Sequence, residues 1–161
     1  GIINEHLHTR KSVSLFDICH MGEFRVSGAG AAKSLDAVLP RSVISQKTGS
    51  CRYNFLLNEN GGIIDDIIVY KMGEDDFFIV VNAGTKDKDA AWLRKNLAAS
   101  EFKDMSEETA KLDLQGPDAK NVLVKLGFDE KSLPLYYSFI KTKIIGMECI
   151  LSRTGYTGEL G

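Results

Sequence analysis

The sequence is poor in the residues that mark disulfide frameworks, zinc sites and charged binding surfaces. It has 3 cysteines, and Cys19, Cys51 and Cys149 are widely spaced and never form a C-x-x-C pair. This spacing argues against a disulfide framework and a zinc site, and it favours small core residues in a reducing compartment. The 20 basic and 22 acidic side chains nearly cancel, so neither a nucleic-acid surface nor a membrane surface is indicated.

Long apolar runs and targeting signals are also missing. No apolar stretch approaches the length of a membrane-spanning helix, and the first residues resemble neither a signal peptide nor a transit peptide. We therefore expect a soluble protein, and 161 residues fit one domain with a sizeable core. The chain begins directly in a helix-like pattern and stops within a loop, so it looks cut at both ends.

The most informative stretch that is present is a strand pattern containing two acids. Turn residues at 58–62 precede the apolar, β-branched run I-I-D-D-I-I-V-Y at 63–70, which is long enough for one strand. Alternation along a strand places Asp65 and Asp66 on opposite faces, and each face also carries apolar side chains. The pattern is typical of a strand covered on both sides, where an unpaired carboxylate is costly.

Three explanations of these acids stay open from the residue types alone. At least one carboxylate points into a ligand cavity and meets a polar or cationic group there, because perturbed acids cluster at functional sites. Alternatively, both acids sit at the open end of the strand, or one pairs with an arginine and holds the sheet.

Two other patterns imitate functional motifs. His6 and His8 could share one face of a strand, but the helix expected at 2–11 separates them and no third ligand is nearby, so we expect no metal site. The glycine-rich segment 27–32 imitates a dinucleotide-binding turn, yet the acid expected about 20 residues later is replaced by T-G-S at 48–50. We interpret these glycines as the entry to a helix that packs on a sheet.

The order of the expected elements mixes hairpins with helices. This order predicts an α+β fold with largely antiparallel sheets and flanking helices. Thr85 is expected to cap the helix that follows it. We expect helices over 2–11, 31–39, 86–97 and 119–126, and strands over 14–20, 23–26, 51–57, 63–70, 77–81, 110–115, 141–145 and 148–153.

Five ordered motifs run through these segments and together resemble one family. They are S-L-F-D-I-C-H-M-G (14–22), N-E-N-G-G-I-I-D-D-I-I-V-Y (58–70), V-V-N-A (80–83) with K-D (88–89), L-Q-G-P (114–117) and S-R-T-G-Y-T-G-E (152–159). This set is similar to aminomethyltransferase, the T-protein of the glycine cleavage system. The resemblance implies a T-protein-like folate-binding fold, of which residues 1–161 would be a part truncated at both ends, with the C-terminal barrel-like domain absent.

The resemblance also implies a reaction and a set of site residues. T-protein transfers a methylene group from aminomethyl-lipoyl H-protein to tetrahydrofolate and releases ammonia, without a metal. Asp66 matches the family's catalytic carboxylate. Met21, Tyr53, Asn82 and Tyr156 match positions that contact the folate.

The implied partner is therefore lipoylated H-protein, with no nucleic acid and no membrane. The implied compartment is the cytoplasm in a bacterium or the mitochondrial matrix in a eukaryote. Asp65 would be the structural neighbour of the catalytic acid.

Two positions depart from the family pattern, and two alternatives stay open. Cys19 stands where Ser is usual, and Leu160 stands where Asp is usual. Because part of the folate pocket would lie beyond residue 161, we expect the fragment to be inactive alone. One alternative is the folate-binding domain of a sarcosine or dimethylglycine dehydrogenase. The other is a non-catalytic folate-binding protein of iron-sulfur assembly, whose K-G-C-Y-x-G-Q-E motif differs from T-G-Y-T-G-E at 154–159.

Overall fold

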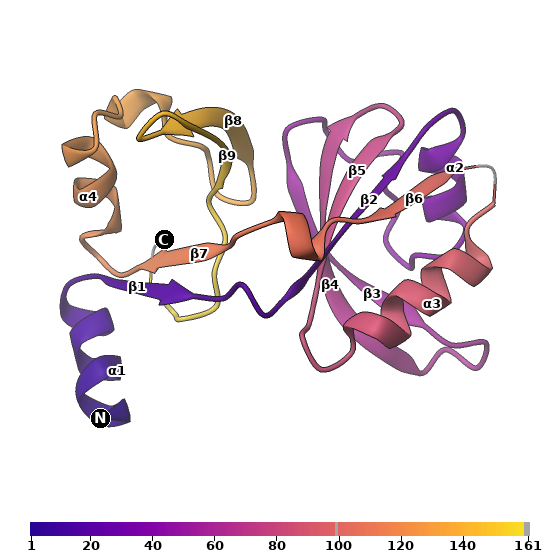
Figure 1. The fold of residues 1–161 in the computed structure, drawn as a ribbon, viewed down its shortest axis with the longest axis horizontal. Coiled ribbons are helices and arrows are strands. Elements are labelled where there is room, and N and C mark those ends of the chain that lie inside the picture. Colours follow the sequence, from indigo (N-terminus) through magenta and orange to yellow (C-terminus); the bar gives the residue numbers. More distant parts are fainter. Residues whose placement is uncertain (99, 160–161) are drawn as a thin grey trace. The chain divides into compact units, whose positions relative to one another are not determined.

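The chain folds into two compact units. The computed structural model describes residues 1–98 and 100–159. The first unit combines Gly1–Ile18 with the residues from Lys111 onward, and the second unit is Cys19–Ala110. The chain leaves the first unit after β1 (Ser14–Asp17) and returns to it before β7 (Leu112–Gln115), as Figure 1 shows. Between these strands the Ile18 N–H donates to the Lys111 carbonyl at 3.1 Å.

The second unit is built on a five-stranded antiparallel sheet. Its strand order is β3-β4-β5-β2-β6, and residues 58–62 connect β3 and β4 as the predicted hairpin. The predicted α+β class with antiparallel sheets and flanking helices is confirmed. The elements are β2 (Gly22–Ser27), α2 (Ala31–Asp36), β3 (Cys51–Leu57), β4 (Ile63–Gly73), β5 (Asp76–Val81), α3 (Lys86–Asn96), β6 (Glu101–Asp104) and the short 3-10 helix η1 (Ser106–Glu108).

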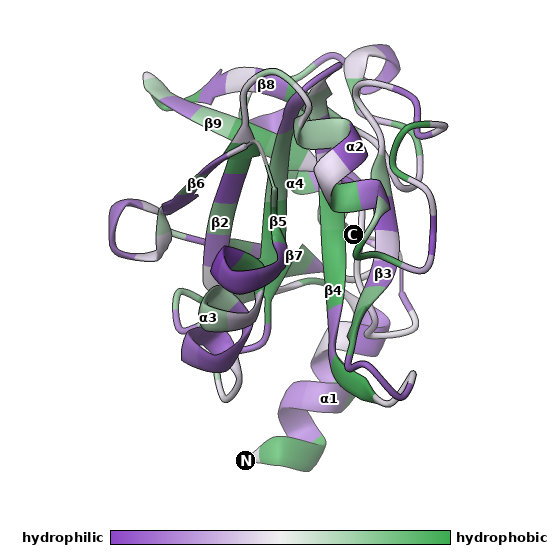
Figure 2. Cartoon of the chain, turned by 90° about the vertical axis from the view of Figure 1, so that its right-hand side faces the viewer, coloured by the Kyte–Doolittle hydropathy of each residue, from purple (hydrophilic) through white to green (hydrophobic). Residues whose placement is uncertain are grey.

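The core of this unit lies on one face of the sheet. Phe24, Ile67 and Ile79 come from three strands and are at most 1% exposed. They pack with Leu35 of α2 and Leu93 of α3, which are fully buried, so both helices cover the same face. Figure 2 shows that apolar residues dominate β4 and β5, whereas hydrophilic residues are frequent on α3.

The opposite face of the sheet mixes buried and exposed side chains. Tyr70 and Val80 are 4% and 3% exposed, but Tyr53 is 37% exposed and Asp66 is also exposed. The expectation that the 63–70 strand is covered on both sides is therefore wrong at Asp66. An apolar side chain on a partly open face looks the same in sequence as one on a covered face.

The glycine-rich turn before α2 is closed by a carboxylate of the chain itself. Asp75 accepts hydrogen bonds from the N–H groups of Ala32 at 2.9 Å and Gly30 at 3.3 Å. These backbone donors hold the pKa of Asp75 below its usual range. The glycines lead into α2, whose Leu35 packs in the core, so the structural interpretation of the glycines is confirmed.

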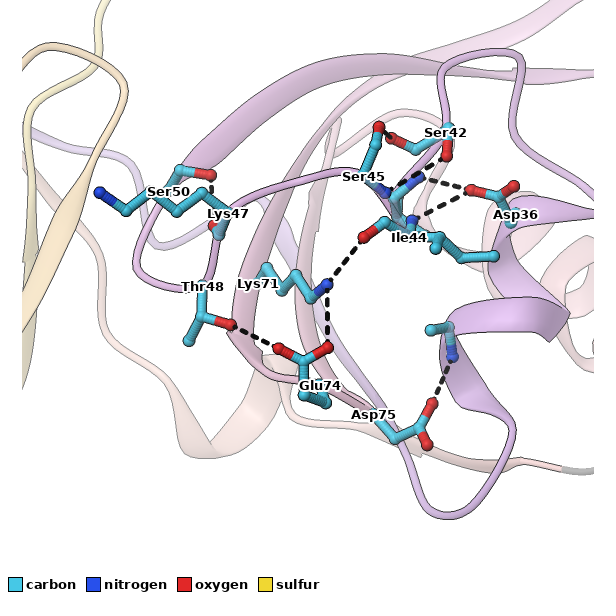
Figure 3. A network of polar contacts seen from close by, with 12 residues as sticks. Asp36, Ser42, Ile44, Ser45, Lys47, Thr48, Ser50, Lys71, Glu74 and Asp75 are labelled. Carbon is cyan, nitrogen blue, oxygen red and sulfur yellow. Dashed lines mark hydrogen bonds and ion pairs between the residues drawn. The ribbon is translucent and has the colours of Figure 1, made fainter.

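A buried lysine anchors the loop between α2 and β3. Lys71 is 2% exposed, and its ammonium group donates to the Ile44 carbonyl at 3.1 Å and lies 3.6 Å from a Glu74 carboxylate oxygen (Figure 3). Asp36 accepts from the N–H groups of Val43 and Ile44 in the same loop. Because Lys71 lies on β4 and Asp36 on α2, these contacts attach the loop to two regular elements.

The first unit consists of two small antiparallel sheets and two helices. The predicted helix at 2–11 and the predicted hairpin around Gly146 are both confirmed. Strand β7 pairs with β1, which is far from it in sequence. The elements are α1 (Ile2–Lys11), β1 (Ser14–Asp17), β7 (Leu112–Gln115), α4 (Ala119–Lys125), the 3-10 helix η2 (Glu130–Ser132), β8 (Phe139–Ile144) and β9 (Met147–Ser152).

The cysteines only partly follow the expectation of small core residues. All three are free thiols, but Cys19 is exposed and Cys149 is half-buried. Cys51 is buried as expected, and its burial raises the pKa of the thiol to about 12. None of the helices formed by the described residues combines the length and apolar character needed to span a bilayer.

Gly116, in the L-Q-G-P motif after β7, is required by a close backbone approach. Its φ of +135° is rarely adopted by other residues, and a Cβ there would overlap the Ser12 carbonyl oxygen and lie 2.8 Å from the Thr9 carbonyl oxygen. The same Ser12 carbonyl accepts a hydrogen bond from the Asp118 N–H at 3.1 Å. The glycine thus allows the turn after β7 to close against the end of α1.

We predict that Gly116→Ala destabilises the first unit by about 2–5 kcal/mol. The unfavourable φ costs roughly 1–2 kcal/mol, and the overlap adds about 1–3 kcal/mol. Gly127→Ala is the matched control, because Gly127 has a φ of +98° and nothing within 4 Å of its added Cβ. Urea unfolding of the full-length protein measures both losses. Equal losses in the two variants would contradict the close approach at Gly116.

Candidate functional site

The first residues of β4 send two carboxylates to opposite faces of the sheet. Asp65 faces the helices and is 7% exposed, whereas Asp66 lies on the other face and is exposed. Strand alternation causes this division, as predicted from the sequence. Both acids lie close to the beginning of β4, as its third and fourth residues.

Asp65 is the acceptor at the centre of a buried polar cluster. Its two oxygens accept from the Asn82 N–H at 3.1 Å, the Asn82 side-chain amide at 3.0 Å and the Thr85 hydroxyl at 2.8 Å. Burial alone would raise the pKa of Asp65, but hydrogen bonds from Asn82, Thr85 and Asp89 outweigh it and hold the pKa below its usual value. Asp65 is therefore ionised.

Thr85 has a different role from the one expected. It occupies the N-cap position of α3, but its side chain makes no capping hydrogen bond. Its hydroxyl donates to Asp65 instead. The prediction of a side-chain cap was wrong because a buried carboxylate within reach is a stronger acceptor than the cap geometry offers.

The Asn82 side chain also contacts the exposed acid. Its amide nitrogen lies 3.2 Å from a carboxylate oxygen of Asp66 and 3.1 Å from the Asp66 carbonyl oxygen. The same nitrogen donates to Asp65, so one amide group joins the two neighbouring acids. This contact limits the directions in which the Asp66 side chain can point.

Asp89 is a member of the cluster that the sequence analysis did not identify. It lies on α3 one turn after Thr85, is fully buried, and its N–H donates to the Thr85 carbonyl at 2.9 Å. Burial, followed by the contact with Asp65, raises the pKa of Asp89 to about 7. The available signal was the spacing of four residues from Thr85 within the K-D motif.

An aromatic and apolar surface surrounds the exposed Asp66. Tyr53 lies opposite Ile68 and Phe55 lies opposite Asp66 in the β3–β4 ladder, so all four side chains share one face. The Tyr53 and Phe55 rings pack edge to face, with centroids 5.0 Å apart. A carboxylate beside exposed aromatic surface can accept hydrogen bonds from a flat, amine-bearing ring that stacks there.

Met21 lies at the same end of the sheet. It immediately precedes β2, whose first residue, Gly22, pairs with Val81, the residue before Asn82. Met21 is half-buried. The structure therefore brings the predicted residues Met21, Asn82 and Asp66 to one end of the second unit, with Tyr53 on the neighbouring strand.

Tyr156 belongs to the first unit and is 85% exposed. It lines a surface hollow with Tyr136, Gly155, Gly158 and Glu159. The aromatic side chain is thus available to a ligand.

The loop that carries Tyr156 is held at both sides. Thr157 donates to Gln115 at 2.9 Å, and Glu159 forms an ion pair with Arg10 at 2.9 Å. The unusual Leu160 lies outside the described residues.

Metal binding has no support in the arrangement of ligand side chains. Across residues 1–98 and 100–159, no three His, Cys, Asp or Glu side chains are grouped as they would be around a metal ion.

Comparison with known proteins identifies relatives along the whole chain. Residues 1–161 match the model of the family described as the GCVT N-terminal domain. Aminomethyltransferases from Thermotoga sp. (strain RQ2) and Chloroherpeton thalassium are 43% and 40% identical to this chain. Each alignment covers 100% of this chain and 45% of the relative, so the chain spans about half the length of these relatives.

Solved structures give the same result at the level of the fold. Glycine cleavage system aminomethyltransferase T from Bartonella henselae has a TM-score of 0.90 and 37% identity, over 99% of this chain and 43% of that protein. A chain of heterotetrameric sarcosine oxidase from Corynebacterium sp. U-96 has a TM-score of 0.66 over 94% of this chain and 77% of its own length. Its 18% identity shows a shared fold alone. The five motifs and these matches agree, and the chain belongs to the GCVT N-terminal domain family.

Proposed function

We propose that this chain is the part of a glycine cleavage aminomethyltransferase that carries the catalytic carboxylate. The full-length protein transfers a methylene group from the aminomethyl-lipoyl arm of H-protein to tetrahydrofolate. The carbon loses its bonds to nitrogen and sulfur and gains bonds to N5 and N10 of the folate. The two protons lost by the folate nitrogens balance the ammonia and the lipoyl thiol that are released.

The observation that carries this proposal is the exposed Asp66 carboxylate beside an aromatic surface. A fixed negative charge near N5 and N10 orients these nitrogens and stabilises the positive charge that develops on the transferred carbon. The Asn82 amide contacts the Asp66 carboxylate and limits its movement, so less reorganisation of this side chain is needed during the reaction. Asp66 is therefore assigned as the catalytic residue.

The folate contacts are assigned to the residues around this carboxylate. Tyr53 supplies an exposed ring on the same face, Met21 supplies an apolar wall, and Asn82 supplies a polar contact. Tyr156, whose ring is exposed, is assigned as a further aromatic contact to the folate. Tetrahydrofolate is a substrate of this reaction, and no metal takes part in it.

The partner and the compartment follow from the same reaction. Lipoylated H-protein delivers the aminomethyl group, so it is the macromolecular partner. The protein then works where glycine cleavage takes place, in the cytoplasm of a bacterium or in the mitochondrial matrix of a eukaryote.

Aminomethyl transfer is favoured over the two alternatives. Relatives named aminomethyltransferase are 40–43% identical along the whole chain, whereas the likeness to sarcosine oxidase is 18%. The segment T-G-Y-T-G-E at 154–159 lacks the lysine and the cysteine of the K-G-C-Y-x-G-Q-E motif of the non-catalytic folate-binding proteins.

We predict that Asp66→Asn abolishes transfer while folate binding survives. The amide keeps the shape of the side chain but removes the charge that stabilises the transition state, so kcat falls by about 100-fold or more and the Kd for tetrahydrofolate changes by less than about tenfold. Calorimetric titration and transfer from loaded H-protein measure the two effects in the full-length protein.

The matched control for this substitution is Asp87→Asn, which changes an exposed acid on α3. It is expected to leave both quantities unchanged. If Asp66→Asn transferred the methylene group as fast as the wild type, Asp66 would not be a catalytic residue. Folate binding without transfer, even in the unaltered protein, would identify a binding relative instead.

The two assigned aromatic contacts give a further prediction. Tyr53→Ala and Tyr156→Ala are each expected to raise the Kd for tetrahydrofolate by about two- to tenfold, because an aromatic contact is worth roughly 0.5–1.5 kcal/mol. Tyr53→Phe and Tyr156→Phe keep the ring and serve as matched controls with nearly unchanged Kd. If Tyr156→Ala binds folate normally, Tyr156 is not a folate contact.

A further inference from the structure

We propose that Asp89 carries a proton at neutral pH, donates a hydrogen bond to Asp65, and through Asn82 positions the catalytic carboxylate of Asp66. Asp89 is thus a positioning residue that does not itself touch the substrate. The positioning role deepens the proposed function and rests on it. The location of the proton is independent of that function.

The first observation is that the Asp89 carboxyl group is fully buried and short of hydrogen-bond donors. Neither carboxylate oxygen accepts a hydrogen bond from any side chain or N–H group in the described part of the chain. A buried carboxylate without a donor is costly, whereas a buried carboxylic acid needs only one acceptor. Asp65, which accepts from the Thr85 hydroxyl one helical turn before Asp89, is the neighbouring acid that supplies this acceptor.

The second observation decides which of the two acids holds the proton. Asp65 already accepts from the Asn82 N–H, the Asn82 amide and the Thr85 hydroxyl, so its ionised form is well stabilised. Asp89 lacks comparable partners. Two neighbouring carboxyl groups share one proton, and it resides on the group whose charge is less well stabilised. The proton therefore belongs to Asp89 and points toward Asp65.

Further contacts connect the Asp65–Asp89 pair to the catalytic residue Asp66. Asp65 fixes Asn82 through two hydrogen bonds, and the Asn82 amide lies 3.2 Å from the Asp66 carboxylate. Loss of the Asp89 proton places a second negative charge beside Asp65 in a site that water does not reach. Repulsion between the two carboxylates then shifts Asp65 and loosens its hold on Asn82.

The charged groups that face Asp89 set the direction of the pH effect. Asp65 on β4 favours the protonated form, and Lys88 on α3 and the Thr85 hydroxyl favour the ionised form. The folded protein keeps the proton up to about pH 7, whereas an unfolded Asp loses it near pH 3.9. The stability contributed by this proton is therefore complete below about pH 4 and is lost as the pH rises through about 7.

Melting experiments on the full-length protein test where the proton lies. Asp89→Asn keeps a donor for Asp65 and cannot ionise, so its Tm should match the wild type near pH 4.5 and exceed it by several degrees at pH 8. Asp87→Asn is the matched control and should follow the wild type at every pH. A constant difference between Asp89→Asn and wild type across this range would overturn the assignment.

A direct titration tests the same point without a destabilising substitution. In wild-type protein labelled with ¹³C at the Asp carboxyl carbons, one resonance should titrate near pH 7, and Asp89→Asn should lack it. If every carboxyl resonance titrates below about pH 5, Asp89 is ionised at neutral pH and the proposal fails.

The positioning role is tested by methylene transfer as a function of pH. Wild-type kcat should fall on the alkaline side with the titration of Asp89, and Asp89→Asn should lack this decline. Asp89→Ala should lower kcat by about tenfold at neutral pH with little change in the KM for tetrahydrofolate, because misplacement of a catalytic group affects the transition state most. Parallel pH profiles of wild type and Asp89→Asn would refute positioning.

These measurements separate the two proposals. If wild-type protein transfers no methylene group, the proposed function and the positioning role both fail, and the titration still decides where the proton lies. If transfer occurs but no carboxyl group titrates near neutral pH, the proposed function stands and the Asp89 inference fails.

Discussion

One amide group, the side-chain nitrogen of Asn82, lies between the carboxylates of two consecutive residues, and the geometry of the candidate site depends on it. It donates to Asp65 at 3.0 Å and lies 3.2 Å from the carboxylate of Asp66. The Asn82 backbone N–H also donates to Asp65, so the asparagine cannot rotate without leaving a buried carboxylate short of donors. The exposed acid therefore derives its orientation from the buried one.

Two adjacent acids in a strand serve this purpose better than acids two residues apart. Alternation sends Asp65 into the space between the sheet and α3, where Thr85 and Asp89 surround it, and sends Asp66 to the open face. The buried acid can then be held by fixed donors, while the exposed acid keeps its oxygens accessible. The same two residues at i and i+2 would share a face and repel each other.

Local sequence patterns predict much of this arrangement. The features that they do not predict depend on contacts between segments distant in sequence. The hairpin ending in the 63–70 strand follows from turn residues and β-branched side chains, and the opposite orientation of its two acids follows from alternation. The openness of the face around Asp66 could not be predicted, because apolar periodicity does not reveal what covers a face. Asp89 was missed for the same reason: burial of a helical acid depends on a strand distant in sequence. Motif resemblance supplied Asp66 and Asn82, but not the cluster that holds them.

The division into two units shows a further limit of local sequence patterns. Strand β7 pairs with β1, although the whole second unit separates the two strands in the sequence. The segment L-D-L-Q at 112–115 does not indicate which strand it pairs with. Closing a loop of this length is entropically unfavourable for an unfolded chain. Folding of the second unit removes most of that cost, because its first and last residues adjoin Ile18 and Lys111, which are hydrogen-bonded to each other. Pairing of β1 with β7 therefore costs less entropy once the second unit has folded.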